Sequence, residues 1–250
     1  MINKISWLQG KTALITGGAK RIGQANALAL AAAGVNVVIH YRHSETAAKE
    51  VVAAVEQLGV KAWALQADLA QPAEAEALFP TALQLAGPLQ ILVNNASIFE
   101  KSRFSTFTLT ELHENIQVNA FAPLQIARAF AQQKQEGAII NFLDSYMQVY
   151  DREHAAYHLS KRMFFSLTRM MALEFAPLLR VNAVAPGLIL PPAGEDASFL
   201  TKLAHTNPLN QVGTLKGITD AVLFLLESEF ITGQVIFVDG GYHMKGQVYG

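Results

Sequence analysis

The chain has 250 residues, of which 51% are hydrophobic and 16% charged, and its formal net charge is −1. This balance suits one α/β domain spanning residues 1–250 better than two small ones, and the lack of a long basic run argues against a nucleic-acid partner. The chain contains no cysteine, which excludes disulfides and thiolate chemistry, and no stretch approaches 18 apolar residues. Because the first ten residues also lack an apolar signal core, we expect a cytoplasmic protein without a membrane partner.

The first chemical signature is a strand, a glycine turn and a helix. An apolar strand at 11–16 leads into a turn at 17–23, and an alanine-rich run at 24–33 predicts a helix that ends at Gly34. In this order the free N–H groups and the helix dipole point at the turn, which is typical of a phosphate site. The dinucleotide fingerprint G-x-G-x-x-G is not matched, because the glycines stand at 17, 18 and 23. A purely structural turn is the alternative.

The second strand, at 35–40, is followed by Tyr41, Arg42, His43 and Ser44. A site for NAD would show Asp or Glu here to hold the ribose hydroxyls. A guanidinium and a hydroxyl suit a 2′-phosphate instead, so this segment predicts NADPH. The alternative is that Arg42 and His43 merely begin an exposed loop.

Strands and helices continue to alternate through residue 99. The pattern predicts a helix at 44–58, a strand at 62–66, a helix to Ala86 and a strand at 89–93, which together require parallel strands with right-handed crossovers. Asp68, just after the third strand, could meet an adenine amino group or cap the next helix.

A carboxyl group, a phenol and an amine are spaced so that they can meet. Tyr157 and Lys161 are four residues apart on an expected helix, which places their Cβ atoms roughly 5 to 6 Å apart. Asp144 follows the apolar run 138–143 and emerges at the carboxyl end of a buried strand, where open α/β sheets bind ligands. An ammonium ~5 Å away contributes about 3 kcal/mol, enough to lower a tyrosine pKa by roughly two units. The alternatives are a chance pattern and a helix-capping aspartate.

The remaining elements complete the sheet. The sequence next predicts a loop at 102–110, a helix opened by Thr110 and Glu111 that continues to Gln133, and a helix from Tyr157 to Phe175. A strand at 181–185 follows, and then an irregular lid at 190–197 with a short helix to His205. The last predicted elements are a helix at 218–227 and a strand at 234–238. We therefore expect a single Rossmann-type, doubly wound domain with a seven-stranded parallel sheet flanked by helices on both faces.

Two further features carry weaker signals. The apolar surface of the helix at 161–175 is wider than one sheet contact requires, which core burial or a subunit interface would explain. His154 and His158 show no metal-ligand spacing, so no metal is expected.

Several of these motifs resemble the short-chain dehydrogenases/reductases over nearly the whole chain. The motifs that occur in that family's order and spacing are Thr16-Gly17 through Ile22-Gly23, Asn94-Asn95-Ala96, Val118-Asn119, Tyr157 with Lys161, and Pro186-Gly187. Details similar to the pteridine reductases, including the dihydromonapterin reductases, are Arg21 where glycine is usual, residues 40–44, residues 95–99, and Asp144 in place of the family's serine.

The resemblance implies a role for each matching residue. Asp144, Tyr157, Lys161 and Asn119 would be catalytic, with Asn119 perturbing its helix and linking a water chain to the lysine. The NADPH contacts would come from Gly17, Lys20, Arg21, Ile22, Tyr41, Arg42, His43, Ser44, Asp68, Leu69, Asn95, Ala96, Ser97, Tyr157, Lys161, Pro186, Gly187 and Leu188. A pterin would lie between Phe99 and the nicotinamide, with Arg21, Ser97, Asp144 and Tyr157 around it. The family also implies a homotetramer.

The expected reaction is reduction of a dihydropterin by NADPH, with Tyr157 giving the proton and Asp144 bonded both to Tyr157 and to the pterin. Sharing a site with an acid suggests that Asp144 has a raised pKa and keeps its proton. A general carbonyl reductase using Ser145 is the first alternative, although Ser145 is 12 residues before Tyr157 where the family's serine is 13. A catalytically silent NADPH-binding sensor is the second.

Overall fold

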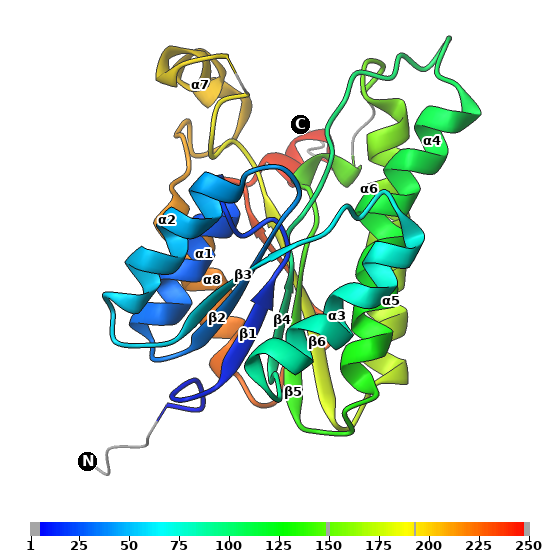
Figure 1. Cartoon of the computed structure of the whole chain (residues 1–250). Helices are drawn as coiled ribbons and strands as arrows, with labels where there is room; N and C mark the ends of the chain where they lie inside the picture. The colour runs from blue at the N-terminus through cyan, green and yellow to red at the C-terminus, as the bar shows by residue number, and fades with distance from the viewer. Residues whose placement is uncertain (1–5, 149–150, 193, 248–250) are drawn as a thin grey trace.

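The computed structural model describes residues 6–148, 151–192 and 194–247, and Figure 1 shows one central sheet between two layers of helices. All seven expected strands are present: β1 (Thr12–Ile15), β2 (Asn36–Tyr41), β3 (Ala62–Gln66), β4 (Ile91–Asn94), β5 (Gly137–Phe142), β6 (Leu179–Pro186) and β7 (Val235–Val238). They are parallel and lie in the order β3-β2-β1-β4-β5-β6-β7, which confirms the predicted doubly wound sheet.

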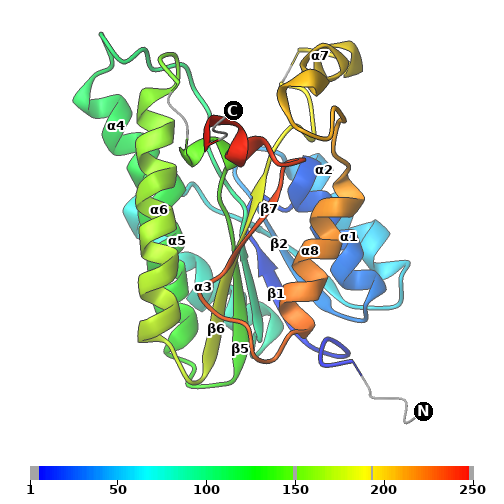
Figure 2. The same ribbon diagram turned by 180° about the vertical axis from the view of Figure 1, so that it is seen from behind.

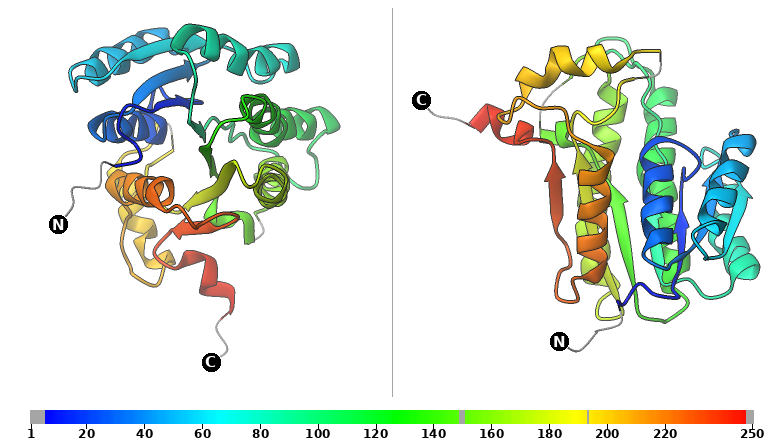
Figure 3. Two further views of the ribbon diagram at one scale, coloured as in Figure 1. Left: turned by 90° about the horizontal axis from the view of Figure 1, so that it is seen from below. Right: turned by 90° about the vertical axis from the view of Figure 1, so that its left-hand side faces the viewer.

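The helices divide between the two faces of the sheet. They are α1 (Arg21–Ala32), α2 (Glu45–Glu56), α3 (Pro72–Ala86), α4 (Leu109–Ile116), α5 (Ala122–Ala131), α6 (Ala155–Glu174), α7 (Ala197–Leu203) and α8 (Leu215–Glu227). Helices α1, α2 and α8 cover one face, and α3, α5 and α6 cover the other (Figures 2 and 3). None of the helices in the described ranges is long and apolar enough to cross a membrane.

The sheet contributes side chains to two hydrophobic cores, one on each face, because successive side chains of a strand point to opposite faces. Leu14 of β1 packs with the cluster under α3, α5 and α6, while its neighbour Ile15 packs with the cluster under α1, α2 and α8. This two-sided burial explains why the strands read as continuous apolar runs. It also leaves the carboxyl ends of the strands as the place where polar side chains gather.

Several helices begin earlier than expected. Helix α1 starts at Arg21 rather than Gln24, α6 at Ala155 rather than Tyr157, and α8 at Leu215 rather than Ile218. Helix α4 is opened by Thr108, not Thr110, because the Thr108 hydroxyl accepts from Glu111 N–H while the Glu111 carboxylate accepts from Thr108 N–H. This reciprocal capping box offsets the missing backbone bonds of the first turn. Ser44 is the N-cap of α2, as expected, but its side chain makes no capping hydrogen bond.

A buried hydroxyl joins the end of β1 to the end of β4. Thr16, 1% exposed, accepts hydrogen bonds at Oγ1 from the backbone N–H groups of Asn95 (2.9 Å) and Ala96 (3.0 Å). The amide of Asn95 donates in return to the carbonyls of Thr16 (2.9 Å) and Gly17 (3.1 Å). These bonds fix the glycine turn against the segment that follows β4.

Replacing Thr16 by valine keeps the volume but removes the acceptor for two N–H groups. We expect Thr16→Val to lower the free energy of unfolding by about 2 to 4 kcal/mol, since a buried donor left unpaired costs roughly 1 to 3 kcal/mol. Urea unfolding followed by circular dichroism measures this. Thr16→Ser keeps the hydroxyl and is the control; an equal loss in both variants would mean that the methyl group, not the hydrogen bonds, matters.

Candidate active site

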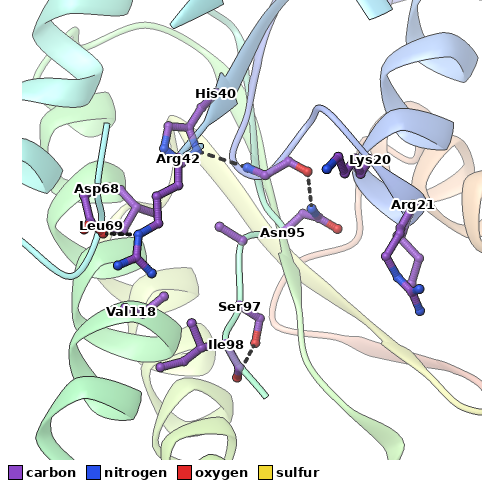
Figure 4. Close-up of a pocket in the computed structure, with 14 residues that line it drawn as sticks. Lys20, Arg21, His40, Arg42, Asp68, Leu69, Asn95, Ser97, Ile98 and Val118 are labelled. Atoms are coloured by element: carbon purple, nitrogen blue, oxygen red, sulfur yellow. Dashed lines mark hydrogen bonds and ion pairs between the residues drawn. The ribbon is translucent and has the colours of Figure 1, made fainter. Parts of the chain in front are cut away.

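Two adjoining cavities lie at the carboxyl ends of the strands. The larger, about 380 Å³, lies where β1 separates β2 from β4 and is shown in Figure 4. Its lining includes Gly17, Lys20, Arg21, Ile22, Gly23, His40, Arg42, Asp68, Leu69, Asn95, Ala96, Ser97, Ile98 and Val118. The smaller, about 210 Å³, shares Arg21, Ile22, Asn95 and Ser97 with it and extends to Asp144, Tyr157, Lys161, Pro186 and Gly187. The strand order predicts a ligand crevice at this point.

His40, in β2, holds the glycine turn through a hydrogen bond to its backbone. The sequence did not single out His40 as a site residue. Gly17 N–H donates to His40 Nδ1 (3.0 Å), and His40 Nε2 lies 3.0 Å from the Ala67 carbonyl, so the neutral ring with its proton on Nε2 satisfies both bonds. Burial lowers the pKa of His40 to about 4, which keeps the ring uncharged. A histidine at a strand end beside a glycine turn is the signal that could have found it.

The turn continues into α1 through a glycine that cannot be replaced. A Cβ on Gly23 would lie 2.1 Å from the Gly17 carbonyl oxygen, so the start of α1 packs directly on the turn. Arg21 has φ +55°, the left-handed conformation that favours glycine, which accounts for the glycine usual here in the resembling family. Its guanidinium donates to the Pro191 carbonyl (2.8 Å). Arg21 therefore connects the turn to the segment after β6, and it lines both cavities.

Arg42 and Asp68 lie at one end of the larger cavity and Lys20 and Arg21 at the other (Figure 4). Arg42 Nε pairs with Asp68 Oδ1 at 3.1 Å, and the same oxygen accepts from Ala70 N–H. Asp68 thus anchors Arg42 and caps the local turn. Tyr41, His43 and Ser44, also expected at the cofactor, do not line this cavity.

The carboxyl group, the phenol and the amine meet in the smaller cavity. Tyr157 on α6 donates its hydroxyl hydrogen to Asp144 Oδ2 (2.5 Å), while Asp144 Oδ1 accepts from Tyr146 N–H (2.7 Å). Lys161, one turn along α6, donates Nζ to the Phe142 carbonyl (2.9 Å) and lies 5.7 Å from the centre of the Tyr157 ring. The three groups come together from β5 and α6, as their spacing predicted.

The expected lowering of the Tyr157 pKa is wrong for this structure. Burial, and then the neighbouring Asp144, raise the pKa of Tyr157 well above its usual value. Burial lowers the pKa of Lys161 to about 8, and the charge of Asp144 opposes that shift. The expectation from sequence counted the effect of the Lys161 ammonium on the Tyr157 pKa but not the effect of burial. Removing the phenol from water disfavours the phenolate and so raises the pKa of Tyr157. Tyr157 therefore keeps its hydroxyl hydrogen near neutral pH.

Asn119 interrupts its helix, as the resemblance implied, in a π-helical turn (Gln117–Phe121) between α4 and α5. Its Oδ1 accepts from Ile98 N–H (2.8 Å) and Ser97 Oγ–H (3.0 Å), and its Nδ2 donates to the Ile98 carbonyl and Ser160 Oγ. Asn119 thus fixes the segment after β4 and reaches the residue next to Lys161. A π-turn of this kind is frequent at functional sites.

The remaining expected residues lie around these cavities. Pro186 and Gly187 line the smaller one, with Ile189 and Leu190, whereas Leu188 lines a separate cavity beside β7. Phe99 lines neither of the two site cavities; its side chain is exposed and stacks on His154. Ser145, the residue of the alternative reading, is fully buried, and its hydroxyl has no hydrogen-bond partner among the described residues.

Comparison with known proteins agrees with this geometry. Residues 17–243 match the family model described as enoyl-(acyl carrier protein) reductase. The chain is 35% identical over 246 residues to 3beta-hydroxysteroid dehydrogenase 1 of Eggerthella lenta, covering 94% of each chain. It is 32% identical over 252 residues to a short-chain type dehydrogenase/reductase of Picea abies, covering 94% of this chain and 93% of that one.

A solved structure with the same architecture is FolM alternative dihydrofolate reductase 1 from Brucella canis, complexed with NADP. It has a TM-score of 0.87 and 31% identity, and the match covers 94% of this chain and 95% of that one. With the parallel sheet, the glycine turn and the pairing of Tyr157 with Lys161, these matches show that the chain belongs to the short-chain dehydrogenase/reductase family.

Proposed function

We propose that this protein uses NADPH to reduce a dihydropterin to its tetrahydro form. The observation that carries the proposal is the hydrogen bond between Tyr157 and Asp144 at the carboxyl end of β5. A ketone needs one proton donor for its oxygen, whereas a pterin also presents ring and amino N–H groups that a carboxylate can accept. The solved relative complexed with NADP, an alternative dihydrofolate reductase, supports both the cofactor and the substrate class.

The described residues fit NADPH. Gly23 packs directly on Gly17, with no side chain between them. Both glycines line the larger cavity together with Lys20 and Arg21, so the cofactor phosphates can approach the backbone at the N-terminus of α1. A guanidinium carries five donors, and the Asp68 contact uses Nε of Arg42, so its terminal N–H groups remain for a 2′-phosphate. NADPH, when bound, supplies the hydride.

The residues of the chain supply and hold the proton. Tyr157 keeps its hydroxyl hydrogen at neutral pH and donates it to the ring nitrogen next to the carbon that is reduced. Lys161 places a cation behind the phenol, which stabilises the phenolate left after transfer. Asp144 orients the phenol through Oδ2, and both of its oxygens have a further lone pair for the N–H groups of the pterin.

The alternative carbonyl reductase with Ser145 is disfavoured by the position of that hydroxyl. Ser145 is fully buried and does not line the cavity that contains Tyr157, while Asp144 does. A serine that polarises a substrate carbonyl must reach the cleft.

A homotetramer is also part of the proposal. Leu159, Met163, Met170 and Leu173 lie along one side of α6 and are 43%, 38%, 62% and 83% exposed. An exposed apolar stripe of this kind suits a subunit contact. Analytical ultracentrifugation tests this, and a measured mass equal to that of one chain would overturn the homotetramer.

Steady-state oxidation of NADPH with a substrate panel tests the proposed function. Dihydromonapterin, dihydrobiopterin and dihydrofolate are compared with a 3-ketoacyl thioester and a quinone. We expect kcat/KM for at least one dihydropterin to exceed that of the carbonyl compounds by about tenfold or more, the size of one charge-assisted hydrogen bond. A preference for the carbonyl compounds would contradict the proposal, and tight NADPH binding without turnover would favour the sensor.

Tyr157→Phe removes the proton donor without changing the shape of the site. We expect kcat for the preferred dihydropterin to fall by roughly 10²- to 10⁴-fold, the usual contribution of general acid catalysis, with NADPH affinity little changed. Stopped-flow turnover and fluorescence titration measure the two quantities. Tyr242→Phe removes a phenol outside the site cavities and is the control. Unchanged turnover in Tyr157→Phe would remove the phenol from the mechanism.

Arg42→Ala tests the cofactor assignment. We expect the Kd for NADPH to rise about 10- to 100-fold and the Kd for NADH to change little, because a charged hydrogen bond contributes about 1.5 to 3 kcal/mol. Isothermal titration calorimetry with both cofactors measures this. Lys61→Ala, which removes one exposed positive charge at the opposite end of the sheet, is the control. An equal loss for both cofactors would count against a contact with the 2′-phosphate.

A further inference from the structure

Phe99 is an exposed ring that is nevertheless held in a defined position. The residue follows β4, its side chain is 55% exposed, and its ring lies nearly parallel to the His154 imidazole, with centroids 4.1 Å apart and planes 13° apart. The Tyr157 ring meets it edge to face at 4.7 Å and 84°. The stack therefore ends beside the phenol that donates the proton.

His154 is itself fixed from two sides. Its Nδ1 lies 2.7 Å from Asp151 Oδ2, so an Nδ1–H donates to that carboxylate. The Asp151 side chain is fixed in turn, because Oδ1 accepts from Glu153 N–H at 2.7 Å. The backbone beside His154 pairs with the segment after Phe99, since Ser102 N–H donates to the Glu153 carbonyl and Ala155 N–H donates to the Ser102 carbonyl.

We propose that Asp151 and His154 are positioning residues that hold the Phe99 ring beside Tyr157, and that this stack favours flat ring substrates over compact ketones. The inference rests on the proposed function, because a pterin is such a flat ring. A free phenylalanine on an exposed loop would lose side-chain freedom when a substrate stacks on it, and that loss weakens binding. The His154 stack removes this freedom before the substrate arrives.

The deciding measurement is the affinity for biopterin of the protein saturated with NADP⁺, which carries no hydride to transfer. Isothermal titration calorimetry compares the wild type with His154→Ala, His154→Phe, Asp151→Ala and the control His113→Ala, an exposed histidine on α4. We expect the Kd for biopterin to rise about 2- to 10-fold in His154→Ala, the contribution of one aromatic stack. His154→Phe restores a flat ring but not the hydrogen bond to Asp151, so it should bind biopterin more tightly than His154→Ala and about as well as Asp151→Ala.

Asp151→Ala should shift the Kd for biopterin in the same direction as His154→Ala, and NADP⁺ affinity should stay constant in all variants. If His154→Ala unfolds, His154→Phe and Asp151→Ala still decide the question. The proposal is overturned if His154→Phe binds biopterin as weakly as His154→Ala, if NADP⁺ affinity falls in parallel, or if no variant differs from the wild type.

The measurement separates this inference from the proposed function. A wild type that binds biopterin but reduces no dihydropterin would disprove the function and leave the positioning test intact. If biopterin does not bind, the flat quinone 9,10-phenanthrenequinone takes its place in the titration. Failure of the wild type to bind either flat ring would overturn this inference, whereas the proposed function fails only if no dihydropterin is reduced.

Discussion

The hydrogen bond between Tyr157 and Asp144 is the interaction on which the active site depends. A phenol that is 6% exposed needs a partner, and the acceptor comes from the residue that emerges after β5, not from its own helix. This bond ties α6 to the sheet where the cavity opens and keeps the proton on the phenol. It also explains why the lysine is placed behind the phenol: a cation near Tyr157 matters most once the proton has left.

The cofactor side of the site depends on small buried contacts of the same kind. His40 below the turn and Asn95 beside it hold Gly17, and the close approach of Gly23 leaves no space for a side chain. Within this frame Arg21 adopts a left-handed conformation that is unfavourable for arginine by roughly 1 kcal/mol or more. Arg21 donates to the Pro191 carbonyl and lines both cavities, so this one side chain connects the glycine turn with the segment that follows β6.

The sequence predicted the architecture well, since the alternation of apolar runs with helical segments left few arrangements other than a parallel, doubly wound sheet. It also placed Asp144 and Tyr157 together, because a strand end and a helix face are set by local pattern. It could not predict what depends on contacts between distant segments. The salt bridge of Arg42 with Asp68 requires β2 to pair with β3, and the raised pKa of Tyr157 requires knowing how deeply the phenol is buried. The stack of Phe99 on His154 joins two loops whose conformations no periodicity encodes.

The central claim is that a carboxyl group at the end of β5, where the resembling family has serine, selects a pterin over a ketone. The most direct measurement is the ratio of kcat/KM for dihydrobiopterin to kcat/KM for ethyl acetoacetate in the wild type and in Asp144→Ser. We predict that the ratio falls by about 10- to 100-fold, because the pterin loses a hydrogen-bond acceptor worth roughly 1.5 to 3 kcal/mol that the ketone does not use. A ratio that stays the same, with both activities falling together, would contradict the claim and reduce Asp144 to a structural support for Tyr157.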